Sequence, residues 1–145
     1  MDIKDTLKKK RGTSVGMVYG VFDGLHEGHK HFLEEAKKFC DKLVVVVAHP
    51  LIVQKLKHHV PYHSSEARIA ALKAFDPKIE AVIGDSSIGT WSALKHYRPD
   101  IVLLGYDQVR LGAELEKLGV HTEIITPHLP DTYKSSLLND YSPLP

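Results

Sequence analysis

Two histidines three residues apart are the first groups in this sequence that could do chemistry. His26 and His29 lie in the run GVFDGLHEGH, directly after a stretch of β-forming residues. Gly20 and Gly24 permit a tight turn and a close approach of backbone to a ligand. Gly28 begins an amphipathic segment, and the free N–H groups at a helix N-terminus favour an anion. We interpret the two imidazoles as a phosphate-binding pair, with a surface pair or a metal site as the alternatives.

Strand and helix patterns alternate around this run. Residues 15–22 are rich in β-formers and predict a buried strand that ends at a turn at Asp23–Gly24. Residues 28–40 carry apolar side chains at helical spacing, with Cys40 on the apolar stripe. Residues 43–48 form a Val-rich run, typical of a strand covered on both faces. Together they predict a βαβ unit.

The rest of the chain repeats this order. Further strands are expected at residues 81–83, 101–104 and 120–125, and further helices at 66–75, 90–97, 109–118 and 134–139. Residues 50–63 have little apolar pattern and are expected to form a long connection, which is more often functional than not. The order predicts an α/β fold with a doubly wound parallel sheet of five strands.

Composition sets the broad class. The chain has 145 residues, 43% hydrophobic and 26% charged, values typical of a single globular domain. The net charge of +1 gives no reason to expect nucleic acid or membrane as a partner. A single cysteine cannot form an intramolecular disulfide, so a cytoplasmic protein is expected. Residues 1–13, with a basic run from Lys8 to Arg11, are expected to be a solvated leader.

The run from Gly20 to His29 resembles the GxFDxxHxGH signature of the cytidylyltransferase-like nucleotidyltransferases, and the resemblance extends from about Val15 to Leu138. It implies a Rossmann-like domain over residues 14–140, followed by a tail at 141–145. It also implies transfer of a nucleoside monophosphate from ATP or CTP to a phosphorylated acceptor, with release of pyrophosphate and with Mg²⁺ or another divalent cation. In this family His26 and His29 would be catalytic. The nucleotide contacts implied in this run are Gly20, Val21, Phe22, Asp23, Gly28 and His29.

Two further segments extend the resemblance, one to the triphosphate and one to the acceptor. Lys55 and Lys57 match lysines that hold the triphosphate in cytidylyltransferases, with Lys55 taken as catalytic; alone they would be solvated loop lysines. The stretch from Tyr62 to Arg68 is similar to the YHSxExR segment of glycerol-3-phosphate cytidylyltransferases. Tyr62 and Arg68 are thereby candidate acceptor-binding residues, and Arg68 could instead be structural.

Two later segments belong to the nucleotide side. The LGYDQ run resembles archaeal-type FAD synthases and implies base and ribose contacts from Gly105, Tyr106, Asp107 and Gln108, although Asp107 and Gln108 could simply cap the next helix. Tyr133, Ser135 and Ser136 are similar to a late phosphate-binding motif, or they are an ordinary helix cap. Relatives with the full motif have an arginine shortly before the serines, and residues 126–132 contain none.

These features leave several functions open. FMN is the favoured acceptor because of the LGYDQ run and the short chain, with Tyr62, Trp91 and Tyr106 able to stack on a flavin or simply to fill a core. Glycerol 3-phosphate or a sugar phosphate is the alternative. A non-catalytic nucleotide sensor would fit the missing arginine. A metal site at His58, His59 and His63 lacks a carboxylate or cysteine nearby. No dedicated protein metal site is therefore predicted. Many relatives are dimers or larger, so a homodimer is expected.

Overall fold

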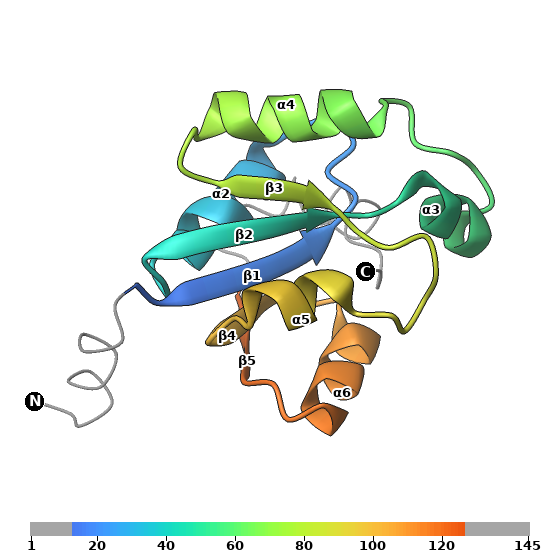
Figure 1. Cartoon of the computed structure of the whole chain (residues 1–145). Coiled ribbons are helices and arrows are strands. Elements are labelled where there is room, and N and C mark those ends of the chain that lie inside the picture. The colour runs from blue at the N-terminus through green and yellow to red at the C-terminus, as the bar shows by residue number, and fades with distance from the viewer. Residues whose placement is uncertain (1–12, 127–145) are drawn as a thin grey trace, which may run out of the picture.

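All five strands of the central sheet run parallel to one another. The computed structural model describes residues 13–126 (Figure 1). The strands are β1 (Val15–Gly20), β2 (Lys42–Val47), β3 (Glu80–Ile83), β4 (Ile101–Gly105) and β5 (Thr122–Ile125). Their order in the sheet is β3-β2-β1-β4-β5. The prediction of a Rossmann-like doubly wound parallel sheet is therefore confirmed. The predicted helix at 134–139, the tail, and nearly all of the leader lie outside the described residues.

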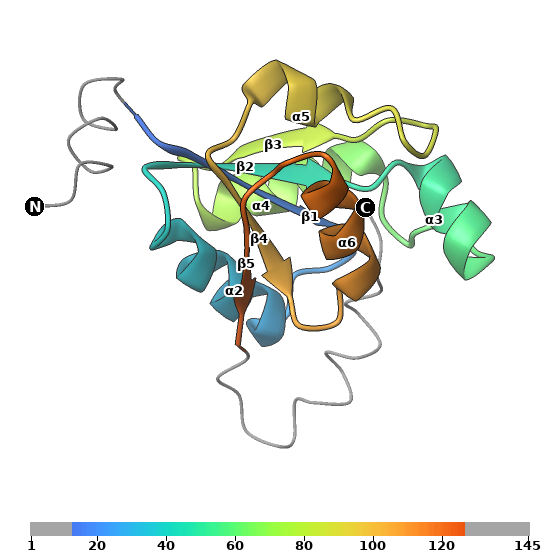
Figure 2. The same cartoon turned by 90° about the horizontal axis from the view of Figure 1, so that it is seen from below.

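Helices cover both faces of the sheet (Figures 1 and 2). The helices are α2 (Glu27–Lys37), α3 (Pro50–Lys57), α4 (Ser65–Phe75), α5 (Ser92–Tyr97) and α6 (Val109–Lys117). Alternate valines of β2 explain the two layers: Val45 and Val47 pack in the core under α2 and α4, whereas Val44 and Val46 pack in the core under α5 and α6. Burial on both faces is the reason that this strand reads as a continuous apolar run.

Helix α3 corrects the expectation for residues 50–63. The first eight of these residues are helical, with Pro50 in the first turn and the His49 side chain accepting a hydrogen bond from the backbone N–H of Leu51 at 3.1 Å. Only Ile52 and Val53 are buried. Leu51 and Leu56 are also apolar but are exposed, so the apolar residues of this segment do not mark one buried face, and the sequence pattern did not reveal this helix. The helix extends beyond the carboxyl ends of the strands (Figure 1).

The first strand is also shorter than predicted. It ends at Gly20, and Val21 and Phe22 stay buried without continuing the ladder. β1 pairs with β2 along its whole length, but it pairs with β4 only at Gly16 and Met17. β1 and β4 therefore separate towards their carboxyl ends. This separation leaves the crevice in which open α/β sheets bind ligands.

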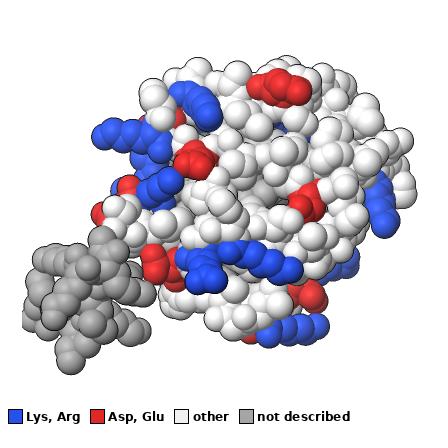
Figure 3. Space-filling view, viewed as in Figure 1, with Lys and Arg blue, Asp and Glu red and all other residues white. Residues whose placement is uncertain are grey.

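The surface of the described part is mixed in charge. Figure 3 shows basic and acidic side chains interspersed over the face viewed in Figure 1. Within residues 13–126, no helix is both long and apolar enough to cross a membrane.

Candidate active site

The two histidines form a reciprocal cap at the N-terminus of α2. His26 Nδ1 accepts a hydrogen bond from the backbone N–H of His29 at 3.2 Å, and His29 Nδ1 accepts one from the backbone N–H of His26 at 3.4 Å. The rings stack with centroids 3.8 Å apart. Because each ring accepts at Nδ1, each carries its proton on Nε2. The cap thus fixes the tautomer in which Nε2 is the nitrogen that can donate to a phosphate oxygen.

The turn before α2 needs glycine at Gly20. A Cβ at this position would lie 2.6 Å from the ring of Phe22. Phe22 itself has a positive φ of 51°, which folds its ring back, and the ring packs on His29 with centroids 5.4 Å apart. Gly24 continues the turn with a φ of 87°. The glycine at position 20 therefore leaves room for the Phe22 ring, which packs on the buried ring of His29.

Asp23 binds residues of the segment before α4. Its carboxylate accepts hydrogen bonds from the backbone N–H of Tyr62 at 2.7 Å, from the backbone N–H of His63 at 2.9 Å, and from His63 Nδ1 at 2.8 Å. Burial raises the pKa of Asp23, but these hydrogen bonds together outweigh burial and hold the pKa below its usual value. Asp23 was predicted as a nucleotide contact; the structure shows it joining the histidine turn to the segment that follows α3.

Arg68 is buried and binds backbone at the ends of two strands. The side chain is 1% exposed, and its Nη1 donates to the carbonyl oxygen of Val21 at 3.0 Å and to that of Ala48 at 2.9 Å. These carbonyls directly follow β1 and β2. Of the two alternatives for this residue, the geometry supports the structural one.

Gln108 makes the matching bridge on the other side of β1. Its Oε1 accepts from the backbone N–H of Gly105 at 2.9 Å, and its Nε2 donates to the carbonyl oxygen of Tyr19 at 3.0 Å. Gln108 stands at the N-cap position, just before α6, but its side chain makes no capping bond there, so the cap interpretation fails for it. Instead it spans the gap where β1 and β4 have separated.

Asp107 follows the end of β4, and the charge of Lys57, the last residue of α3, acts on its carboxyl group. Both carboxylate oxygens of Asp107 are buried, and within residues 13–126 no other residue forms a hydrogen bond with them. Burial raises the pKa of Asp107 to about 6, although the positive charge of Lys57 acts to lower it. Lys55 is exposed and, two residues away on a helix, points to a different side. The structure therefore brings Lys57 to the site more directly than Lys55.

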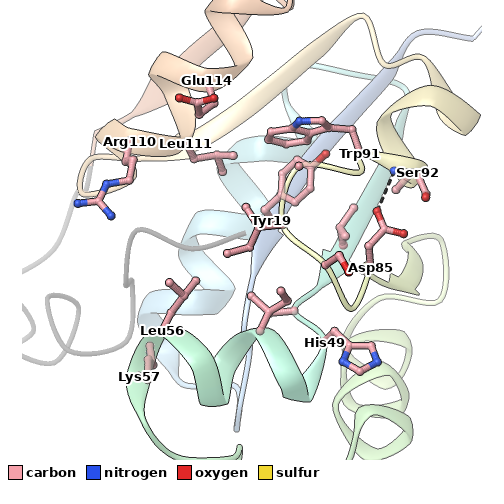
Figure 4. Close-up of a pocket in the computed structure, with 18 residues that line it drawn as sticks. Tyr19, His49, Leu56, Lys57, Asp85, Trp91, Ser92, Arg110, Leu111 and Glu114 are labelled. Carbon is pink, nitrogen blue, oxygen red and sulfur yellow. Dashed lines mark hydrogen bonds between the residues drawn. The ribbon is translucent and has the colours of Figure 1, made fainter.

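A cavity of about 460 Å³ opens beside this crevice, on the side of the sheet covered by α5 and α6 (Figure 4). Its wall is mostly apolar, with polar groups at several points, a composition typical of small-molecule sites. Residues on its wall that the sequence did not single out are Tyr19, His49, Asp85 and Arg110. Of the three aromatic residues considered for stacking, Trp91 lines the cavity, whereas Tyr62 and Tyr106 do not.

The described residues build no dedicated metal site. Within residues 13–126 no three His, Cys, Asp or Glu side chains come together in a way that could hold an ion, which removes support for a site at His58, His59 and His63. Mg²⁺ commonly binds through substrate phosphates and keeps several waters. A cation that arrives with a triphosphate therefore does not need a cage of three protein ligands. Tyr133, Ser135 and Ser136 lie outside the described residues.

A parallel sheet with donors at the N-terminus of α2 and a ligand cavity beside its switch point defines a nucleotide-binding α/β domain. Comparison with known proteins makes the class specific. Residues 17–136 match the family model described as cytidylyltransferase-like. The chain belongs to this family and is a nucleotidyltransferase, which favours the enzyme over the non-catalytic sensor.

Individual relatives agree with this family. The chain is 40% identical to an FAD synthase of Thermococcus sibiricus, covering 91% of this chain and 88% of the relative. It is 38% identical to an FAD synthase of Pyrococcus horikoshii, covering 81% of each. Among solved structures, a lipopolysaccharide core biosynthesis protein of Thermoplasma volcanium matches with a TM-score of 0.67 and 32% identity, over 83% of this chain and all of that one (100%). A pantoate-β-alanine ligase of Francisella tularensis, 19% identical with a TM-score of 0.55 over 85% of this chain and 61% of its own, shows likeness of fold alone.

Proposed function

We propose that this nucleotidyltransferase transfers AMP from ATP to FMN and produces FAD and pyrophosphate. The observation that carries the proposal is the similarity to FAD synthases over about nine tenths of the chain. The cavity supports it independently, because a largely apolar wall suits an isoalloxazine ring and does not suit glycerol phosphate, a small and fully polar acceptor. The proposed acceptor phosphate would lie at the cavity mouth, near Lys57.

The chemistry needs no protein nucleophile. An oxygen of the FMN phosphate attacks the α-phosphorus of ATP in line, the new P–O bond forms, and the bond from the α-phosphorus to the oxygen of the β-phosphate breaks. Pyrophosphate leaves with that electron pair. The attacking phosphate is already ionised, so no general base is required. Catalysis then depends on positioning and on neutralising the developing charge.

The residues of the site fit these tasks. The Nε2–H groups of His26 and His29 would donate to phosphate oxygens at the N-terminus of α2. Lys57, between the crevice and the cavity, would balance the charge of the two approaching phosphates, with Lys55 contributing from outside. A divalent cation would accompany the triphosphate and neutralise part of its charge.

Pyrophosphate release tests the proposal directly. The full chain would be assayed with Mg²⁺ and either ATP or CTP, in the presence and absence of FMN, with glycerol 3-phosphate as the competing acceptor. We expect release that requires both ATP and FMN, with FAD as the second product. Release with glycerol 3-phosphate and CTP, and none with FMN, would refute the assignment.

Two further expectations accompany this function. ATP and FMN are intracellular metabolites, which supports a cytoplasmic location. The expected homodimer is tested by light scattering of the purified chain, where a monomer mass would refute it.

A further inference from the structure

The hydroxyl of Tyr19 is a buried donor without a partner at the cavity wall. Tyr19 is 6% exposed, its side chain lines the cavity, and its hydroxyl oxygen is buried with no hydrogen-bond partner among residues 13–126. Folded proteins satisfy nearly all buried polar groups, so an unpaired one at a ligand cavity calls for an explanation. Burial raises the pKa of Tyr19 and the charge of Asp85 raises it further, so the hydroxyl keeps its proton and can donate.

The indole of Trp91 packs against this tyrosine. The two rings meet edge to face, with centroids 6.1 Å apart and planes at 90°, and Figure 4 shows them together at one side of the cavity. Trp91 has φ 58° and ψ 38°, a left-handed conformation that bulky residues rarely adopt. The side chain of Trp91, at the N-cap position of α5, makes no capping hydrogen bond, and residues 86–90 before it are exposed. The ring contact therefore places the left-handed backbone of Trp91 beside the unpaired hydroxyl of Tyr19.

We propose that Tyr19 is a specificity-determining residue for the acceptor, and that Trp91 is the ring that uncovers it. When a planar heteroaromatic ring enters the cavity, the indole turns onto the face of that ring, and the Tyr19 hydroxyl donates to a carbonyl oxygen or nitrogen at the ring edge. The inference rests on the proposed function, because isoalloxazine is such a ring. An acceptor without an aromatic ring offers neither the stacking face nor the ring-edge acceptor.

Asp85 adds a second polar contact on the same wall. One oxygen of its carboxylate accepts a hydrogen bond from the backbone N–H of Ser92 at 2.9 Å, which fixes its orientation near the start of α5. The isoalloxazine edge presents an imide N–H between two carbonyl groups. A donor at Tyr19 and an acceptor at Asp85 complement this alternation, and a purely apolar pocket would not.

Riboflavin provides the test, because it carries the ring without the phosphate. Trp91 is the single tryptophan of the chain, so intrinsic fluorescence reports on the cavity. The full-length protein would be titrated with riboflavin as wild type, as Tyr19→Phe and as Tyr97→Phe. Tyr97 is the matched control. It packs on the same face of the sheet as Tyr19, but its hydroxyl donates to Glu80 and its side chain does not line the cavity.

We expect Tyr19→Phe to raise the riboflavin Kd about three- to tenfold, the loss of one neutral hydrogen bond, with the KM for FMN raised similarly and the KM for ATP unchanged. Its thermal midpoint should not fall, because the lost hydroxyl had no partner. Tyr97→Phe should lower the midpoint and leave the Kd unchanged. If Tyr19 were only structural, Tyr19→Phe would lower the thermal midpoint and would not weaken riboflavin binding selectively.

Two results would overturn the inference: a Tyr19→Phe protein that binds riboflavin as tightly as wild type, or wild-type Trp91 fluorescence that does not respond to riboflavin. The pyrophosphate assay separates this outcome from failure of the proposed function. FMN-dependent release that Tyr19→Phe leaves unchanged refutes the role of Tyr19 and keeps the function. Absence of such release together with Tyr19-dependent riboflavin binding refutes the function and keeps the ring site.

Discussion

Replacing Arg68 by methionine would decide whether this arginine supports the fold or binds the acceptor. Methionine keeps much of the aliphatic volume and removes the guanidinium. Two hydrogen bonds from a charged donor to the carbonyls of Val21 and Ala48 disappear, each contributing about 1.5–3 kcal/mol. Removing a buried charge regains part of this, since the charge no longer has to be desolvated. We expect a net loss of roughly 2–4 kcal/mol in the free energy of unfolding.

Urea unfolding followed by circular dichroism measures this loss. The midpoint should fall while the slope with urea stays constant, because the surface exposed on unfolding does not change. Lys73→Met is the control, since Lys73 is an exposed charged residue on the same helix and its replacement should stay within about 0.5 kcal/mol. At a temperature where the variant remains folded, the ratio of KM for FMN to KM for ATP should match wild type. An Arg68→Met protein of wild-type stability with a selectively raised KM for FMN would refute the reasoning and return Arg68 to the acceptor.

Three further substitutions test the site. His29→Ala should lower kcat for pyrophosphate release by about 10²–10³, the scale of one lost phosphate donor, and a near wild-type rate would contradict its assignment. Gly20→Ala should destabilise the fold by roughly 1–3 kcal/mol in urea, because its Cβ would lie 2.6 Å from the Phe22 ring; wild-type stability would show that the ring can move freely. The pKa of Asp23 is lowered in the folded state, so its contribution to stability is present above its unfolded value and is lost as pH falls through the folded value. Asp23→Asn should therefore be less stable than wild type at pH 7 and should approach it as pH falls through the lowered folded-state pKa of the carboxyl group, and parallel stability curves for the two proteins would contradict the shift.

The sheet could be predicted because its signals are local. Val-rich runs mark strands covered on both faces, and the apolar stripe of residues 28–40 marks the helix between them. Helix α3 was not predicted because its apolar residues do not mark one face: Ile52 and Val53 are buried, whereas Leu51 and Leu56 are exposed. The position of the histidine pair at the start of a helix could also be predicted, since glycines and a strand-to-helix turn surround it within ten residues of sequence.

The partners of the other polar residues could not be predicted. Residue type shows that Arg68 and Gln108 can form hydrogen bonds, but it does not show whether a ligand or a carbonyl group receives them. Gln108 reaches the carbonyl of Tyr19 from 89 residues away, and only the packed sheet sets that distance. The cavity is a similar case. Tyr19 lies within a strand, and its contact with a ligand depends on where α5 and α6 settle.

The early end of pairing between β1 and β4 has a consequence for motion. Beyond Met17 these strands are joined through the Gln108 side chain rather than through a continuous ladder. Strands β1 to β3 on one side and β4 with β5 on the other share the same core but few backbone hydrogen bonds, and amide hydrogen exchange would measure whether they open as separate cooperative units. In the proposed function, a nucleotide bound across the crevice would contact both groups of strands and should slow exchange in both together. The bound substrate would then connect the carboxyl ends of β1 and β4, which do not pair with each other there.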